Sequence, residues 1–240
     1  MANSTSANSS SLDPVGQNIL ETVQKAGHYN RWLFSLIKPY LKGEIIEIGS
    51  GIGNFTSPLV QQNYQVTATD YNQVYLTNLT QKLSNLKTFN FDLTSVTVPR
   101  ALLNKFDTAI CLNVLEHIAE QNQALQNIYH TLKPGGKLII LVPAFRIAFG
   151  KLDINLGHIR RYTQKSLKNA LVRNNFTVEK SRYLNPLGLF GWWVNSLLRR
   201  STISPWQIWL FEFLSRPQLF VEKFISFPFG LSVLSTAVKQ

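Results

Sequence analysis

The chain alternates short apolar runs with longer segments in which apolar residues recur every three or four positions. A short apolar run bounded by turn residues predicts a buried strand, and the longer spacing predicts a helix packed on one side. The predicted strands are residues 44–48, 64–70, 88–93, 106–114, 137–142, 177–184 and 231–238. The predicted helices are residues 15–41, 55–62, 115–132 and 164–174. This alternation predicts an α/β fold, a doubly wound domain with a seven-stranded, mostly parallel sheet.

A hydrophobic insert, residues 185–228, separates the last two predicted strands and is expected to form a helical cap or extension. The charge-free run 183–198 is shorter than the roughly 20 apolar residues that a bilayer-spanning helix needs. Four tryptophans lie in the insert and arginines flank them, which is typical of a membrane-surface contact. Packing on the sheet or on a second subunit explains the same pattern, so a substrate cap and a homodimer remain open. The four tryptophans are Trp192, Trp193, Trp206 and Trp209.

A glycine-rich turn follows the strand 44–48. Gly49, Gly51 and Gly53 remove side chains where the backbone turns and approaches a ligand, and the next helix directs its positive N-terminus at the same place. This predicts a nucleotide-cofactor site at the carboxyl end of the first strand. The third glycine comes one residue earlier than in the dinucleotide pattern G-x-G-x-x-G. Glu47, just before the turn, suits a ligand with an ammonium group, which a pyrophosphate lacks.

Acidic residues end the next two predicted strands. Asp70 lies about twenty residues beyond the glycines, where an acid hydrogen-bonds ribose hydroxyls. Asp92 ends the third strand, and the segment 113–117, Asn-Val-Leu-Glu-His, follows the fourth. Parallel strands bring their carboxyl ends to one edge, so we expect these segments to line one crevice.

In order and spacing, these blocks and the segment Leu-Lys-Pro-Gly-Gly at 132–136 resemble the class I S-adenosylmethionine-dependent methyltransferases over residues 44–143. The resemblance implies S-adenosylmethionine as cofactor. It also implies that Asp92 accepts from the adenine amino group, that the backbone of Leu93 completes that contact, and that Tyr29 belongs to a lid over the active site. The expected cofactor-binding residues are Glu47, Gly49, Ser50, Gly51, Gly53, Asp70, Asp92, Leu93 and Asn113.

A second cluster follows the fifth strand, where substrates bind in such sheets. Arg160 and Arg161, with His158 and Tyr162 beside them, can hold an anionic part of the acceptor through charge-assisted hydrogen bonds. The stretch 157–163, Gly-His-x-Arg-Arg-Tyr-Thr, resembles bacterial methyltransferases found beside glycosyltransferases, in surface-glycan and lipid-linked sugar pathways. A basic loop that ties the next helix to the sheet is the alternative.

Two histidines are the candidate catalytic residues. An unionised hydroxyl or amine acceptor needs a base, and histidine titrates near neutral pH. His117 follows the fourth strand and can face the methyl group, although capping or packing at the helix start is an equal alternative. His158 lies in the loop of the second cluster. Cys111 is the chain's single cysteine, which excludes a Cys-rich zinc site, and we expect no metal.

The net charge of +11 and the sequence pI near 9.8 favour an anionic partner: nucleic acid, an acidic membrane surface or an acidic substrate. Residues 111–114 lack the Asp/Asn-Pro-Pro-aromatic block of amino-group DNA methyltransferases, which argues against nucleic acid. We therefore expect a cytoplasmic or peripheral methyltransferase domain over 15–240, preceded by a disordered tail at 1–14. Its acceptor is expected to be a small or lipid-linked molecule, methylated at oxygen and bearing an anionic group. An NAD-dependent oxidoreductase and a non-catalytic cofactor-binding subunit remain open alternatives.

Overall fold

A computed structural model of the chain describes residues 27–200, 202, 204–222 and 224–240. Within these residues seven strands form one sheet, in the order β3-β2-β1-β4-β5-β7-β6. Only β7 runs antiparallel to its neighbours, so the predicted mostly parallel sheet is confirmed. The strands are β1 Glu44–Ile48, β2 Gln65–Asp70, β3 Lys87–Asn90, β4 Phe106–Leu112, β5 Leu132–Pro143, β6 Phe176–Leu184 and β7 Ser232–Lys239.

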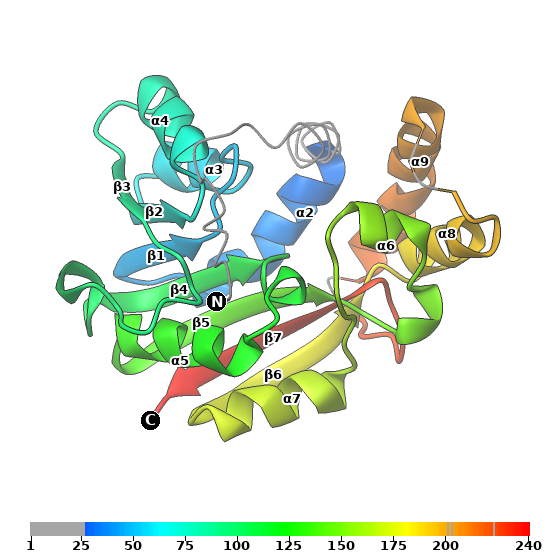
Figure 1. The fold of residues 1–240 in the computed structure, drawn as a ribbon. Coiled ribbons are helices and arrows are strands. Elements are labelled where there is room, and N and C mark those ends of the chain that lie inside the picture. Colours follow the sequence, from blue (N-terminus) through cyan, green and yellow to red (C-terminus); the bar gives the residue numbers. More distant parts are fainter. Residues whose placement is uncertain (1–26, 201, 203, 223) are drawn as a thin grey trace, which may run out of the picture.

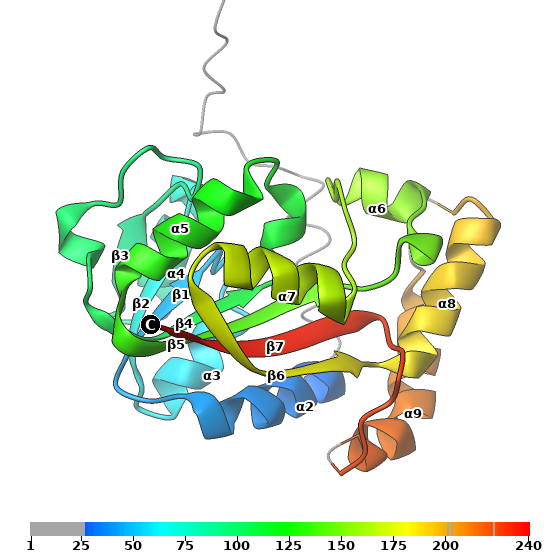
Figure 2. The same ribbon diagram turned by 90° about the horizontal axis from the view of Figure 1, so that it is seen from below.

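Helices cover both faces of the sheet (Figures 1 and 2). One face carries α2 (Gly27–Ile37), α3 (Thr56–Gln61) and α4 (Gln73–Lys82). The other carries α5 (Gln121–Thr131) and α7 (Gln164–Arg173). Four short 3-10 turns connect these elements: η1 Lys38–Tyr40, η2 Arg100–Leu102, η3 Leu115–His117 and η4 Arg146–Ala148.

The strand β1 shows how the core is divided between the two faces. Successive side chains of a strand point to opposite sides. Accordingly Ile45 packs in the cluster that contains α2, whereas Ile46 and Ile48 pack in the cluster that contains α5. All three are buried. The sheet is therefore apolar on both faces, as a parallel sheet between two helical layers must be.

The predicted helical insert is confirmed as α8 (Pro186–Leu197) and α9 (Pro205–Val221). Together with the short helix α6 (Lys151–Asn155) they lie beyond the carboxyl ends of β5 and β6 (Figure 1). The helix α9 packs against α2 and α8. The insert is thus placed at the edge of the sheet where the ligand-binding loops lie.

Two predicted helices differ from the structure. The predicted helix 115–132 is split into η3 and α5, because carbonyls that would continue the helix bond to a distant loop instead. Ile159 N donates to Glu116 O (3.0 Å), and Arg160 Nη2 donates to Ala119 O (2.9 Å). In the predicted helix 15–41, residues before 27 lie outside the described part, as does the predicted tail. Its described end is α2 followed by η1.

The prediction missed two helices, α4 and α6, and made β3 too long. The segment of α4, Gln-Val-Tyr-Leu-Thr-Asn-Leu-Thr-Gln-Lys, is mostly polar and its apolar spacing is weak. The helix α6 has only five residues. The strand β3 ends at Asn90, so Asp92 lies in the following turn. In that turn Asp92 Oδ1 accepts from Thr94 N and from Thr94 Oγ1, both at 2.8 Å.

Candidate active site

The glycine turn joins β1 to α3 at the carboxyl edge of the sheet, where the sequence predicts the cofactor crevice. Gly49, Gly51 and Gly53 have φ values of +69°, +51° and +89°, a region that side chains disfavour. A Cβ on Gly49 would lie 2.5 Å from Val114 Cγ2, so the turn is in contact with the end of β4. Ser50 N donates to a β2 carbonyl at 2.9 Å. The predicted tight glycine turn after the first strand is therefore present.

Two buried carboxylates face this turn. Asp70 ends β2 and accepts from Gly51 N and from Asn72 N, both at 2.9 Å. Glu47, in β1, accepts from Thr56 Oγ1 at 2.6 Å. Burial raises the pKa of both groups, and that of Glu47 reaches about 7. In the described part of the chain neither carboxylate has an ion-pair partner.

These groups fit S-adenosylmethionine. A buried carboxylate without a cation suits an ammonium group, and Asp70 keeps lone pairs for ribose hydroxyls beyond its two backbone donors. The hydroxyl of Ser50 is buried without a hydrogen-bond partner, so the turn also offers an unused polar group. The remaining predicted residues lie along the same edge. Leu93 is buried, and Asn113 is exposed after β4 with φ of 54°.

We expect Asp70→Ala to weaken S-adenosylmethionine binding by about 1.5–3 kcal/mol, the usual range for hydrogen bonds to a charged group. That corresponds to roughly 10–100-fold in Kd. Isothermal titration calorimetry measures the effect. Asp70→Asn is the matched control, because it keeps the shape and one acceptor oxygen, and its loss of affinity is expected to be smaller. Equal affinity in wild type and Asp70→Ala would contradict the ribose role.

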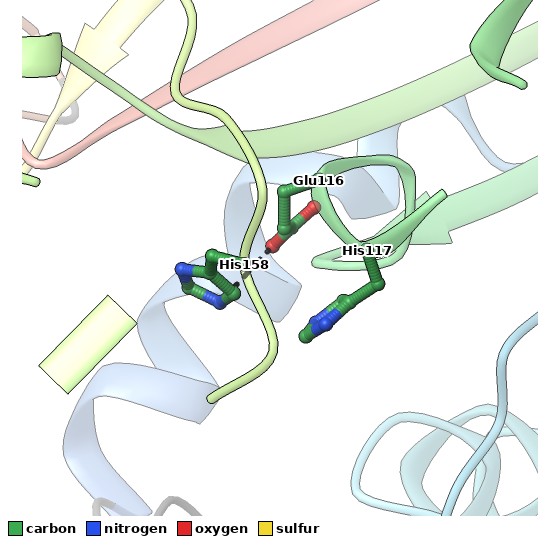
Figure 3. A group of neighbouring side chains, drawn as sticks. All are labelled: Glu116, His117 and His158. Atoms are coloured by element: carbon green, nitrogen blue, oxygen red, sulfur yellow. Dashed lines mark ion pairs between the residues drawn. The ribbon is translucent and has the colours of Figure 1, made fainter. Parts of the chain in front are cut away.

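A second group of side chains lies beside the crevice, contributed by η3 and by the loop after α6 (Figure 3). The side chain of Glu116 has no solvent exposure, and neither carboxylate oxygen has a hydrogen-bond partner among the residues that the structure describes. His158 Nε2 lies 3.9 Å from Glu116 Oε1. The ring centroids of His117 and His158 are 4.9 Å apart. Burial, opposed by the charge of Arg161, raises the pKa of Glu116 to about 8.

The hydrogen bonds of the two rings identify their free nitrogens. His158 Nδ1 lies 2.9 Å from Asp153 Oδ1 and His117 Nδ1 lies 3.3 Å from Gly157 O. Both partners are acceptors, so we assign the proton to Nδ1 in each ring, which leaves the lone pair of a neutral ring on Nε2. Desolvation is the main cause that lowers the pKa of His117 to about 4, and the charge of His158 contributes less. His117 is therefore a neutral imidazole at physiological pH.

The buried carboxylate of Asp153 anchors the loop after α6 through three side-chain hydrogen bonds. It accepts from Arg161 Nε (2.7 Å), from Trp192 Nε1 (3.0 Å) and from His158. The Arg161 guanidinium also lies over the Trp192 ring, with Cζ 5.1 Å from the centroid. Burial alone would raise the pKa of Asp153. The hydrogen bonds with His158 and Arg161 outweigh this effect and lower the pKa to about 2. This buried group links α6, the following loop and α8.

The structure corrects three predictions. Arg161 has no exposed side-chain surface and pairs with Asp153, so the two adjacent guanidiniums do not grip one anion together. Tyr162 is 4% exposed, packs in the core and donates to Gln121 Oε1 at 3.1 Å. Trp192 is bonded inside the protein, which removes it from the proposed surface aromatics. In each case the side chain was predicted to be available to a ligand or a surface, but it binds a buried acceptor or packs in an apolar cluster inside the protein.

Arg160 and Tyr29 remain candidates for contact with the acceptor. Arg160 is half-buried, and its Nη2 donates to Ala119 O beside η3. Tyr29 lies in α2. The centroid of its ring is 5.4 Å from the ring centroid of Trp32 and 6.2 Å from that of Phe211. Sequence reasoning gave no role to Glu116 or Asp153. An acid next to His117 directly after a predicted strand was the signal available for Glu116.

A family model described as a methyltransferase domain matches residues 20–181, more than half of the chain. The chain belongs to this methyltransferase family. Membership of this family supports S-adenosylmethionine as the cofactor and counts against the oxidoreductase alternative.

Curated relatives are similar to parts of this methyltransferase. The ubiquinone biosynthesis O-methyltransferase of Rickettsia akari is 32% identical over 133 residues, 54% of this chain and 48% of the relative. The protein with the same name in Pseudomonas entomophila is 25% identical over 97 residues, 40% of this chain and 42% of the relative. The chain therefore spans about half the length of the curated relatives it matches.

Solved structures share the fold. An S-adenosylmethionine-dependent methyltransferase from Mesorhizobium loti has a TM-score of 0.60 at 16% identity, covering 87% of this chain and 98% of its own. One from Archaeoglobus fulgidus has a TM-score of 0.61 at 16% identity, covering 93% and 99%. The cyclase SpnF has a TM-score of 0.57 at 18% identity, covering 88% and 81%. The last example shows that the fold alone does not fix the reaction.

Proposed function

We propose that this methyltransferase acts on a hydroxyl oxygen of a small or lipid-linked acceptor. The observation that carries the proposal is the buried, unpartnered carboxylate of Glu116 beside His117 and His158. Glu116 lies in η3, and Val114, between β4 and η3, is in contact with the glycine turn. An acceptor bound there meets groups that can take up a hydroxyl proton next to the cofactor crevice.

The positions of the residues indicate which task the cofactor performs and which tasks the side chains perform. When bound, S-adenosylmethionine supplies a methyl group already activated by the positive sulfonium, so alignment of the acceptor is the main task of the protein. Proximity and orientation can lower a barrier by about 7–11 kcal/mol. His117 Nε2 is free to take the hydroxyl proton, and His158 is the second candidate. Arg160, at the rim beside η3, is the remaining arginine for an anionic part of the acceptor.

Methylation at oxygen has support from the relatives named as O-methyltransferases, although this chain covers only about half of each. A lipid-linked acceptor has support from the resemblance of the loop 157–163 to methyltransferases beside glycosyltransferases. Both remain part of the proposal.

We expect His117→Ala to lower kcat by about 10²–10⁴, the range for loss of a general base, with the Kd for S-adenosylmethionine nearly unchanged. The assay follows S-adenosylhomocysteine with catechols, hydroxylated sugars and polyprenyl-phosphate-linked sugars as acceptors, and NMR locates the methyl group. His130→Ala is the matched control, because His130 is exposed on α5 away from the cluster. Methylation of nitrogen or carbon, or full activity of His117→Ala, would contradict the proposal.

The insert supports a membrane-surface location for the acceptor. Glu212 and Gln218 of α9 face the protein, whereas Arg216 is exposed. Glu212 accepts from the α2 backbone at His28 N (3.1 Å) and Tyr29 N (3.2 Å), and Gln218 accepts from Leu187 N (3.0 Å). Leu219 is buried, but most apolar residues of α9 face outward, the reverse of an ordinary surface helix. They include Trp206, Trp209, Leu210, Phe213, Leu214 and Phe220, all exposed.

We propose that this outward face of α9, hereafter the α9 face, lies on an anionic bilayer. Large exposed apolar patches mark interaction sites. The exposed basic residues Arg199, Arg200 and Arg216 lie beside it, which suits anionic headgroups. Within the described residues no helix is long and apolar enough to cross a membrane.

We expect the double variant Trp206→Ser with Trp209→Ser to lose at least about tenfold in affinity for anionic vesicles, because both rings contribute apolar insertion. Co-sedimentation at low and high salt measures the binding, and salt is expected to weaken it. Val96→Ser with Ile147→Ser is the control, since both side chains are exposed elsewhere (90% and 72%). Wild-type protein that binds no vesicle, but whose dimer is lost in the tryptophan variant, would make the α9 face a subunit interface instead.

A further inference from the structure

Three side chains beside the crevice form a set that matches the ligands of a transition metal. One ligand atom from each of Glu116, His117 and His158 lies within 4.8 Å of the others. They come from two segments about forty residues apart, η3 and the loop after α6 (Figure 3). We propose that these three side chains bind one divalent ion of the zinc class.

The burial of Glu116 is the first argument. Its side chain has no exposed surface, and neither oxygen has a hydrogen-bond partner in the described structure. Leaving a buried polar group unpaired costs several kcal/mol, so such groups in folded proteins are usually paired or bound to a metal. The nearby guanidinium of Arg161 is already neutralised by its ion pair with Asp153 at 2.7 Å. Glu116 therefore has two buried oxygens without a partner in the described part of the chain, and a bound cation would satisfy them.

The orientation of the histidines is the second argument. Metal-bound histidines donate their other N–H to a carboxylate or a backbone carbonyl, which fixes the ring and directs the lone pair at the ion. Both arrangements occur here. His158 Nδ1 is bonded to Asp153 Oδ1 (2.9 Å) and His117 Nδ1 to Gly157 O (3.3 Å). Each ring thus has its Nε2 available as a ligand.

The two segments are held together without any ion. Ile159 N donates to Glu116 O (3.0 Å) and Arg160 Nη2 donates to Ala119 O, just after η3 (2.9 Å). The distance from His158 Nε2 to Glu116 Oε1 is 3.9 Å. Ligands at about 2.0–2.2 Å from a tetrahedral zinc ion are roughly 3.3 Å apart. Because the ligand atoms lie within 4.8 Å of one another, side-chain rotations that bring them closer by about 1.5 Å at most would close the site around an ion.

The donor set indicates which ion and what role. Imidazole suits zinc and similar transition metals, and two histidines with one carboxylate leave a fourth position open, as in catalytic zinc sites. Calcium and magnesium prefer oxygen ligands. Resting on the proposed function, the open position would take the acceptor hydroxyl. With the ion bound, His117 Nε2 would be a ligand and no longer the base; the ion would lower the pKa of the bound hydroxyl, and the proton would leave to solvent. The hydroxyl oxygen would bond to the methyl carbon while the sulfur–methyl bond breaks with both electrons remaining on sulfur.

Metal binding is tested on the full chain, first treated with a chelator and then dialysed, without cofactor or acceptor. Zn²⁺ is titrated in competition with a chromophoric chelator, and Co²⁺ is added as a spectroscopic probe. We expect one tight ion per chain and visible Co²⁺ absorption typical of a site with fewer than six ligands. Glu116→Gln and His158→Ala are expected to lose at least tenfold in Zn²⁺ affinity. His130→Ala is the control and is expected to bind as wild type does.

The outcomes separate this inference from the proposed function. Wild-type protein that binds no Zn²⁺, or Glu116→Gln and His158→Ala variants that are folded by circular dichroism and bind Zn²⁺ unchanged, would overturn the metal site. Should either variant fail to fold, the Co²⁺ spectrum of His117→Ala decides, and an unaltered spectrum would likewise overturn it. Because no acceptor is present, failure of hydroxyl methylation leaves these results unaffected.

Discussion

Asp153→Ala is expected to destabilise the protein by about 3–5 kcal/mol, the usual cost of removing one partner of a buried ion pair. The carboxylate has no exposed surface and accepts from Arg161, Trp192 and His158. It also accepts from Gly150 N at 3.0 Å and so begins α6. Its loss leaves the Arg161 guanidinium buried without a counter-charge. Chemical denaturation, followed by circular dichroism, gives the free energy of unfolding.

A second variant separates the charge from the packing. Arg161→Met keeps much of the apolar stem and removes the guanidinium, so the double variant Asp153→Ala with Arg161→Met is expected to recover part of the loss. Losses that simply add would show that the two residues act independently. If Asp153→Ala alone lowered the free energy of unfolding by less than about 1 kcal/mol, which is typical of exposed ion pairs, a stabilising role of the buried Asp153 carboxylate would be contradicted.

Gly49→Ala is expected to weaken S-adenosylmethionine binding by at least about tenfold, equivalent to about 1.4 kcal/mol. The new methyl group would lie 2.5 Å from Val114 Cγ2, so either the turn or the end of β4 must move. The φ of +69° adds a backbone cost of about 1–2 kcal/mol for a residue with a Cβ. Calorimetry measures the affinity, and denaturation measures the accompanying loss of stability.

Gly135→Ala is the matched control for this variant. Gly135 has a similar φ of +74°, but a Cβ there meets no atom within 4 Å. The control therefore carries the same backbone cost without the collision, and Gly135 lies near the start of β5, away from the glycine turn. Cofactor affinity is expected to be that of wild type. If both variants bind the cofactor equally, the contact between the glycine turn and β4 has no role in binding.

The sequence predicted the sheet well because its information is local there. A run such as 44–48, Glu-Ile-Ile-Glu-Ile, ends at glycines, and only a strand followed by a tight turn satisfies both features. Parallel strands then place their carboxyl ends at one edge, so the crevice near Asp70 follows from strand order alone. The weakly patterned α4 and the very short α6 carried too little periodicity to be recognised.

The neighbours of the loop after α6 were beyond the sequence. Arg160 and Arg161 are adjacent in the chain, yet one lies at the rim and the other is buried against Asp153. The acceptors that other segments provide decide which of the two arginines is buried. The spacing of residues along the chain carries no information about those acceptors. The same reason explains Trp192, whose partner Asp153 lies 39 residues away.

The sequence by itself determined the fold class, the glycine turn and the acids at the strand ends, because period, turn chemistry and strand order are properties of the chain. Only the tertiary structure decided that Glu116 is buried beside His117 and His158, and that α9 turns its apolar side outward. Both depend on which distant groups compete for each hydrogen bond. In α9 the inward polar residues cap α2 and bond to α8, so its apolar residues are left to face outward.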